Sequence, residues 1–306
     1  MVSSANLSRR SLADAPHTAA WRGSTDGTPR MQRMLIRLFK LCPLVVVYAV
    51  MGLVIPFYML FAKGFRASYD FYRKRMGYGP IRSFFGVYWN EFNLGMVVLD
   101  RFAAYSGKQF RFEIEGHAHF LELLRQPEGF IMIGSHFGNH EMAGYFIKSD
   151  SKRINALVYS GETQTVMEGR SRRFGDTNVQ MIPIAEDMSH IFAMNEALAN
   201  GEILSVAGDR CFGSDKVIRC PFFGQDASFP MGLFRLAVQR EVAMVALFVT
   251  KESVNGYKVW VDPLPQATGA KRDEKMHSLC AAYAALLEKR ARQYPHQWYN
   301  FYDFWA

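Results

Sequence analysis

The chain has 306 residues, 49% of them hydrophobic, so it can bury a large core as one domain or as one domain with appendages. Its 36 Lys and Arg outnumber its 28 Asp and Glu, and the net charge of +8 favours anionic partners such as acidic lipids, phosphates, an acidic carrier protein or nucleic acid. The composition excludes a fibrous protein. Cys42, Cys211, Cys220 and Cys280 match neither a Cys-x-x-Cys metal knuckle nor a disulfide framework, which favours a reducing compartment.

The N-terminal part divides into a tail and an apolar segment. Residues 1–30 are rich in Ser, Ala, Thr, Gly and Arg without an apolar period, which predicts a disordered tail. Residues 41–62 contain no charged side chain and are long enough to cross about 30 Å of hydrocarbon. We therefore expect a membrane anchor helix with basic flanks over 31–78. Pro43 and Pro56 would bend this helix, so a helix in the soluble core or one lying flat on the membrane is also considered.

The remaining residues, 79–306, are predicted to form one catalytic domain. An aromatic-rich stretch over 80–105 predicts one or two helices, and strands and helices then alternate. The strands are expected near 109–115, 129–135, 154–159, 178–183, 202–207, 242–250 and 257–262. The helices are expected near 117–126, 139–148, 162–173, 187–200, 230–241 and 271–293. This alternation predicts an α/β sheet covered on both faces by helices. Residues 208–230 lack a clear period and are predicted to be a loop that forms part of a substrate site.

The most informative motif follows the apolar run 129–135. Ser-His-Phe-Gly-Asn-His-Glu reads as a strand that ends in a tight turn into a helix, with His136 on the turn and Glu141 early in the helix. A histidine can take a proton from a hydroxyl at neutral pH, and a carboxylate can hold its ring. Such a pair suits acyl transfer. The alternative is that His136 caps a helix and Glu141 lies in solvent.

The same turn offers backbone donors. The amides of Gly138, Asn139 and His140 lie at a predicted helix N-terminus, where an anion is favoured, so they are candidates to bind an oxyanion or a phosphate. A metal site is the alternative, because His136 and His140 are four residues apart. That spacing brings two ligands together only on one helix, and no third ligand is evident in the sequence.

Basic residues downstream are candidates to bind phosphate. Arg170 and Arg173 stand near the end of a predicted helix, where a solvated helix C-terminus is the alternative reading. Asp209 and Arg210 end a predicted strand, where α/β proteins build their sites, and Asp209 is interpreted as the salt partner of Arg210. The apolar segments 221–224 and 229–232 can line an acyl groove or simply pack.

Together these motifs resemble the lipid A biosynthesis acyltransferase family, the lauroyl and myristoyl transferases of Gram-negative bacteria. The matching motifs are His136-x-x-x-x-Glu141, Gly208-Asp209-Arg210, Pro221-Phe222-Phe223-Gly224, Phe229-Pro230-x-Gly232 and the patch 297–301. The family commonly has Trp before the acid, where this chain has His140. Relatives of this fold acylate other acceptors, including glycolipids, aminolipids and polyene-type pigments.

The resemblance implies an α/β fold with a central mixed sheet flanked by helices, of the glycerolipid acyltransferase type, and an N-terminal membrane helix. It also implies transfer of a fatty acyl group from a thioester to a lipid hydroxyl, at the bacterial inner membrane with the catalytic domain facing the cytoplasm. His136 then matches the base and Glu141 its partner carboxylate. Asn139, Arg170, Arg173 and the pair Asp209 and Arg210 are the expected substrate-binding residues.

The leading hypothesis is thus a membrane-associated O-acyltransferase without an acyl-enzyme or a cofactor. Its donor is acyl carrier protein or acyl-coenzyme A, and its acceptor is a lipid or glycolipid. The sequence lacks a Gly-x-Ser-x-Gly elbow, which argues against a serine hydrolase. The alternative is a catalytically idle lipid-binding or scaffold protein of the same fold. A nucleic-acid binder is disfavoured because the basic residues are scattered and no binding module is recognisable.

Overall fold

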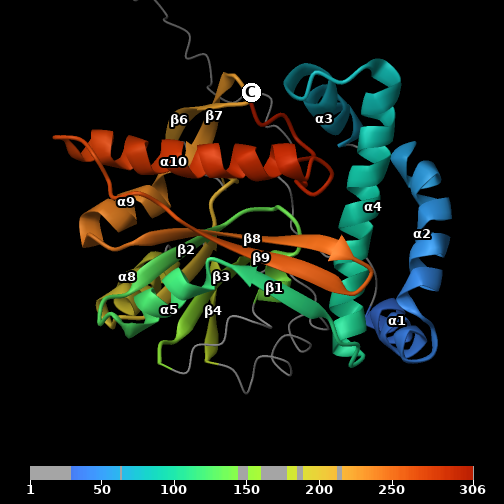
Figure 1. Ribbon diagram of the computed structural model, residues 1–306, viewed down its shortest axis with the longest axis horizontal. Coiled ribbons are helices and arrows are strands. Elements are labelled where there is room, and N and C mark those ends of the chain that lie inside the picture. Colours follow the sequence, from blue (N-terminus) through green and yellow to red (C-terminus); the bar gives the residue numbers. More distant parts are fainter. Residues whose placement is uncertain are drawn as a thin grey trace, which may run out of the picture.

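The computed structural model describes residues 29–62, 64–143, 151–159, 178–184, 189–211 and 216–305. Within these residues a seven-stranded sheet has the order β1-β9-β8-β2-β5-β3-β4, and every neighbouring pair is parallel except β8 and β9. The strands are β1 (Arg111–Glu115), β2 (Phe130–Gly134), β3 (Ile154–Tyr159), β4 (Val179–Ile184), β5 (Ile203–Ala207), β8 (Met244–Ser253) and β9 (Gly256–Pro263). The predicted mixed sheet is confirmed (Figure 1).

Helices cover both faces of this sheet, as predicted. They are α5 (His117–Arg125), α6 (His140–Ala143), α8 (Ser189–Ala199), α9 (Met231–Arg240) and α10 (Arg272–Gln293). Because successive side chains of a strand point to opposite faces, β2 contributes to two cores. Ile131 and Ile133 join a cluster with α8, α9 and α10, whereas Phe130 and Met132 join one with α5. The predicted helix over 162–173 lies outside the described residues.

The segment predicted as a loop is in large part an antiparallel hairpin. β6 (Val217–Phe222) and β7 (Gln225–Pro230) form a separate two-stranded sheet, connected by Phe223 and Gly224 with φ of 51° and 79°. Positive φ at both positions makes the tight turn that the right-handed twist of paired strands favours. The prediction was wrong because Phe-Gly is a weaker turn signal than Asn-Gly. In the structure, every second residue of β6 is buried.

The N-terminal helices lie on one side of the sheet (Figure 1). They are α1 (Pro29–Leu41), α2 (Leu44–Met59), α3 (Phe65–Asp70), the π-helical turn η1 (Phe71–Arg75) and α4 (Pro80–Tyr105), and α1 and α2 both contact α4. One continuous helix over 41–62, as expected for the anchor, is not observed, and an anchoring role for 31–78 stays a prediction. Pro43 separates α1 from α2, which at 16 residues is about 24 Å long. Within the described residues, no helix combines the length and apolarity needed to cross a bilayer. Residues 29 and 30, placed in the tail, begin α1.

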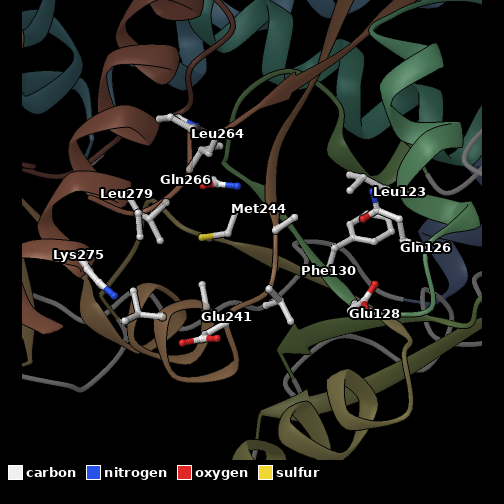
Figure 2. A pocket seen from close by; sticks show the side chains of 17 residues that line it. Leu123, Gln126, Glu128, Phe130, Glu241, Met244, Leu264, Gln266, Lys275 and Leu279 are labelled. Atoms are coloured by element: carbon white, nitrogen blue, oxygen red, sulfur yellow. The ribbon is translucent and has the colours of Figure 1, made fainter. Parts of the chain in front are cut away.

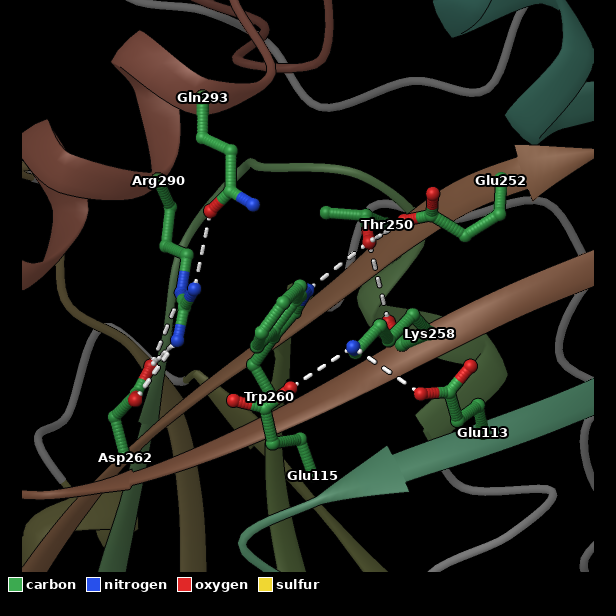
Figure 3. A network of polar contacts seen from close by, with 9 residues as sticks. All are labelled: Glu113, Glu115, Thr250, Glu252, Lys258, Trp260, Asp262, Arg290 and Gln293. Atoms are coloured by element: carbon green, nitrogen blue, oxygen red, sulfur yellow. Dashed lines mark hydrogen bonds and ion pairs between the residues drawn. The ribbon is translucent and has the colours of Figure 1, made fainter.

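A polar cluster connects α10 to β9 and to the edge strand β1 (Figure 3). The indole ring of Trp260 lies between the Lys258 ammonium and the Arg290 guanidinium, 4.2 and 3.8 Å from the ring centroid. Arg290 is 3% exposed and bonds both carboxylate oxygens of Asp262, at 2.7 and 2.8 Å, while Lys258 pairs with Glu115 at 2.8 Å. Planar bidentate pairing and stacking are geometries that arginine provides and lysine does not.

Candidate active site

Strand register brings the proposed base and an acid together. In the parallel pair β2 and β5, Gly134 lies opposite Ala207, and the amide of Gly208 donates to the Gly134 carbonyl at 2.9 Å. His136 and Asp209 each stand two residues beyond these strand ends. Parallel strands end at the same edge of a sheet, where α/β proteins place their ligands. The two residues therefore meet although 73 positions separate them in the sequence.

His136 and Asp209 form a hydrogen-bonded pair. Nδ1 of the imidazole lies 2.8 Å from Oδ1 of Asp209, and the backbone amide of His136 donates to Oδ2, also at 2.8 Å. A carboxylate only accepts hydrogen bonds, so the proton of a neutral ring resides on Nδ1 and the lone pair on Nε2. This tautomer suits a general base. Glu141 was the predicted ring-holding carboxylate, whereas in the structure this contact is made by Asp209.

The Asp209 carboxyl is ionised at neutral pH. It is 2% exposed, and burial by itself would raise its pKa. The charge and hydrogen bonds of His136, together with the charge of Arg210, overcome this effect and hold the pKa of Asp209 at about 2. A permanently charged carboxylate stabilises the imidazolium that forms when His136 takes a proton. The interpretation of Asp209 as merely the salt partner of Arg210 was thus too narrow.

Backbone hydrogen bonds hold the turn in place. The amide of Gly138 donates to the Gln297 carbonyl at 2.6 Å, and that of Asn139 donates to the Val249 carbonyl at 2.8 Å. Gly138 has a φ of 59°, and a Cβ atom there would lie 1.8 Å from the Val249 oxygen, so only glycine fits. The prediction that the amides of Gly138 and Asn139 bind an anion is wrong, because the protein itself uses both donors.

Asn139 connects the turn to a buried polar network. The residue is 2% exposed, and its Nδ2 donates to the Tyr257 hydroxyl at 3.1 Å. Tyr257 and Tyr48 both donate to the carboxylate of Asp100, which also lies 2.5 Å from the Lys251 ammonium. These residues come from α2, α4, β8 and β9. The network thus attaches the N-terminal helices to the turn that carries His136, and the substrate contact expected of Asn139 stays a prediction.

Glu141 is held by helix α4. Its Oε2 lies 2.8 Å from Nε of Arg101, and its Oε1 accepts from the Tyr105 hydroxyl at 2.9 Å. The Glu141 side chain is only 7% exposed, so the reading of a solvated carboxylate does not apply. Sequence reasoning missed Arg101 and Tyr105, because nothing in the α4 pattern distinguishes them from other polar residues of a helix.

Arg210 lies beside the His136 and Asp209 pair. Its Nη2 donates to the Tyr299 carbonyl at 3.0 Å, and its guanidinium lies 6.0 Å from the ring centroid of Tyr302. Burial lowers the pKa of Arg210, and the Asp209 charge opposes this effect. The predicted phosphate ligands Arg170 and Arg173 lie outside the described residues. A phosphate-binding role for Arg210 stays a prediction.

Aromatic residues of the hairpin pack together rather than lining an open groove. Phe222 and Phe229 are fully buried, and the ring centroid of Phe222 lies 5.3 Å from that of Trp298. Sequence reasoning did not recognise Trp298 as a site residue, although it noted the aromatic patch that contains it. The indole Nε1 of Trp298 lies 3.3 Å from Oδ2 of Asp209.

The metal alternative gains no support from the helix geometry. Helix α6 begins at His140, so His136 lies outside it and the two residues are not helical neighbours. Their ring centroids are 6.0 Å apart. Within the described parts of the chain, no three metal-ligating side chains come together.

A cavity of about 620 Å³ lies at the opposite ends of the same strands (Figure 2). Phe130 and Met244, at the starts of β2 and β8, line it together with Glu241 and Lys275. Its volume falls within the range of small-molecule sites. None of the predicted site residues contributes to its lining, so the chemistry of His136 is located elsewhere.

Comparisons with known proteins place the chain in a family. No curated protein matches it. Among solved structures, the 1-acyl-sn-glycerophosphate (LPA) acyltransferase PlsC from Thermotoga maritima is similar, with 12% identity over 84% of this chain and 100% of that chain and a TM-score of 0.39. The sequence model described as bacterial lipid A biosynthesis acyltransferase matches residues 87–306, which include His136, Glu141, Asp209 and Arg210. The chain therefore belongs to the bacterial lipid A biosynthesis acyltransferase family.

Proposed function

We propose that this protein is a membrane-associated acyltransferase that moves a fatty acyl group from an acyl thioester to a hydroxyl of a lipid or glycolipid. The donor is carried by acyl carrier protein or coenzyme A. The observation that carries this proposal is the contact between His136 Nδ1 and the ionised Asp209 inside the region that matches the family. A base held in this tautomer is what an alcohol needs to attack a thioester.

In the proposed reaction, Nε2 of His136 takes the proton of the acceptor hydroxyl as its oxygen attacks the thioester carbonyl. The tetrahedral intermediate collapses, the carbon–sulfur bond breaks, and the leaving thiolate takes the proton back from the imidazolium. An ester and a free thiol result, without an acyl-enzyme. Asp209 stabilises the imidazolium, and Glu141 holds the turn against α4 through Arg101 and Tyr105.

Replacing His136 tests this function. We expect His136→Ala to lower transfer from labelled acyl carrier protein or acyl-coenzyme A to extracted bacterial lipids by about 10²-fold to 10⁴-fold, the range of general-base catalysis. His119→Ala is the matched control, because this histidine lies on α5, where it pairs at 3.8 Å with an exposed Glu122. Full activity in His136→Ala would reject His136 as the base, whereas no transfer by the unchanged protein would favour the idle lipid-binding protein. Lipid profiling of cells with and without the protein would identify the acceptor.

Membrane association rests on an apolar surface of the N-terminal helices. Large side chains of α2, α4 and the chain just after α2 are about half exposed or more; they are Val45, Val46, Val50, Leu53, Val54, Phe57, Tyr58, Leu60, Phe61, Ile81, Phe84, Phe85 and Trp89. Helix α1 carries the basic residues Arg30, Arg33, Arg37 and Lys40. Exposed apolar side chains combined with cations suit an anionic lipid surface. We place the protein at the bacterial inner membrane, with residues 79–306 facing the cytoplasm, where thioester donors are made.

Vesicle binding tests this placement. Leu53 and Phe57 are 74% and 70% exposed, and we expect the double change Leu53→Ser and Phe57→Ser to reduce co-sedimentation with vesicles containing phosphatidylglycerol. Phe192→Ser on α8 removes an equally exposed apolar side chain, at 77%, from a helix that packs on the sheet, and should bind as the unchanged protein does. Equal loss in both proteins would argue against a specific membrane-facing surface.

A further inference from the structure

The last residues of the chain pair with the turn that carries His136. The segment 295–305 follows α10, and within it the amide of Tyr299 donates to the His136 carbonyl at 2.8 Å. The Gly138 amide donates to the Gln297 carbonyl, and Phe137 forms an antiparallel bridge with Trp298. One hydrogen bond on each side of a bridged residue pair is the repeating pattern of an antiparallel ladder. The C-terminal segment therefore fixes the backbone on both sides of Phe137.

The same segment contacts Asp209 and its neighbour. Trp298 Nε1 donates to Oδ2 of Asp209 at 3.3 Å, and the Tyr302 hydroxyl donates to the Asp209 carbonyl at 3.1 Å. Arg210 donates to the Tyr299 carbonyl at 3.0 Å. Oδ2 thus receives both the Trp298 indole and the His136 amide, while Oδ1 receives the ring of His136. These donors oppose rotation of the carboxylate about its Cβ–Cγ bond.

The other side of the segment 295–305 is attached to the N-terminal helices. The Tyr72 hydroxyl of η1 donates to the Pro295 carbonyl at 2.8 Å, and Nδ2 of Asn90 on α4 donates to the Trp298 carbonyl at 2.9 Å. Ser68 on α3 donates to the Asn300 carbonyl at 3.4 Å. The segment is therefore held between the helices on one side and the His136 and Asp209 pair on the other.

We propose that residues 295–302 of this segment form a positioning element of the active site, and that Trp298, together with the His136 amide, fixes the Asp209 carboxylate against the His136 ring. The proposal rests on the proposed function of His136 and adds a role for the C-terminal residues. A base whose partner can rotate spends less time in the reactive geometry, and a misplacement of about 1 Å can cost about 10²-fold in rate. Trp298 acts through Asp209 and does not contact the reacting atoms in this assignment.

The chain offers a matched control. Trp298 and Trp305 belong to one aromatic cluster, with ring centroids 6.1 Å apart. The indole of Trp305 donates to the Phe222 carbonyl at 3.0 Å rather than to Asp209. Trp298→Phe and Trp305→Phe therefore each make the same side-chain change within one aromatic cluster and remove one indole hydrogen bond. Only the first loses a donor to the proposed catalytic pair.

The experiment compares kcat and KM of both variants as full-length protein in detergent micelles, with labelled acyl carrier protein as donor. We expect Trp298→Phe to lower kcat about 10-fold to 100-fold with KM unchanged, and Trp305→Phe to keep kcat within about threefold. The NMR signal of the His136 ring proton on Nδ1, identified by its absence in His136→Ala, should weaken or shift only in Trp298→Phe. If Trp298→Phe does not fold, replacing Trp298 by the isosteric 3-benzothienylalanine removes the N–H alone.

Three results would overturn the assignment. Equal kcat in the two tryptophan variants, or a loss in Trp298→Phe that appears in KM alone, would show that Trp298 only packs. A ring-proton signal unchanged in Trp298→Phe would do the same. Failure of the proposed function is recognised separately, by activity that survives His136→Ala; the NMR comparison then still decides whether Trp298 positions the pair.

Discussion

The carboxylate of Asp209 contacts His136 twice, at ring atom Nδ1 and at the backbone amide, each at 2.8 Å. The ring contact sets the tautomer, and the amide contact fixes the carboxylate relative to the turn. One buried acid thus determines both the position of the base and the atom that accepts the proton. The following predictions test this arrangement and the structure that supports it.

Asp209→Asn should lower kcat by about 10³-fold, because an amide side chain can donate to Nδ1 and stabilise the wrong tautomer, and because it removes the charge that stabilises the imidazolium. The measurement is steady-state transfer from a labelled thioester. Asp226→Asn is the control, since Asp226 is an exposed residue of β7. A loss smaller than about threefold would show that His136 needs no acid at Nδ1.

Asp100→Asn should lower the free energy of unfolding by about 3 to 5 kcal/mol, because it leaves the buried ammonium of Lys251 without its counter-ion. Asp100 is fully buried and Lys251 is 8% exposed. Urea unfolding measures the change. Adding Lys251→Met should recover part of the loss by removing the unpaired charge. Asp70→Asn breaks the exposed pair with Lys74 and should cost less than about 1 kcal/mol. Equal losses of unfolding free energy in Asp100→Asn and Asp70→Asn would contradict a stabilising role of the buried network.

Gly138→Ala should displace the His136 turn, because its Cβ would overlap the Val249 oxygen. We expect kcat to fall at least about 10-fold, given how sharply rates depend on the placement of a base. Gly224→Ala supplies the comparison: its φ is also positive, at 79°, but no atom lies within 4 Å of the added Cβ. That variant should lose about 1 to 2 kcal/mol of stability through backbone strain and keep its kcat. Similar kcat values for both variants would mean that the turn tolerates movement.

Glu91→Gln should change how stability depends on pH. Burial raises the pKa of Glu91 to about 7, above its ordinary 4.5. Between these values the folded protein keeps a proton that the unfolded chain releases, so this residue makes the fold less stable as the pH rises from about 4.5 to 7. The variant should therefore gain about 3 kcal/mol over the unchanged protein between pH 4.5 and 8.

Chemical denaturation at several pH values measures that gain. Glu122→Gln, which changes an exposed glutamate, is the comparison and should not reproduce the gain of Glu91→Gln. A constant difference between Glu91→Gln and the unchanged protein across the pH range would show that Glu91 is ionised throughout in the fold.

Local sequence patterns were sufficient to predict most of the helices and strands. The apolar run 129–135 and the alternation over 109–115 predicted β2 and β1 to within two residues, because burial imposes a period on neighbouring side chains. The prediction of a single helix over 41–62 was wrong, and the reason is also local. The hydropathy of these residues suggested one helix over the whole segment, but Pro43 separates α1 from α2, and α2 covers only Leu44–Met59.

The sequence by itself determined the α/β fold, the family resemblance and His136 as the candidate base, since each rests on short motifs or periodic patterns whose members are close together along the chain. Which acid holds that base was decided only by tertiary structure. Glu141 is five residues away and binds α4, whereas Asp209 reaches the ring because β2 and β5 lie side by side in register. The contact of Trp298 with Asp209 also depends on tertiary structure, because Trp298 follows α10 and pairs with Phe137. Strand order and register depend on packing across the whole sheet, and no local pattern of side chains encodes them.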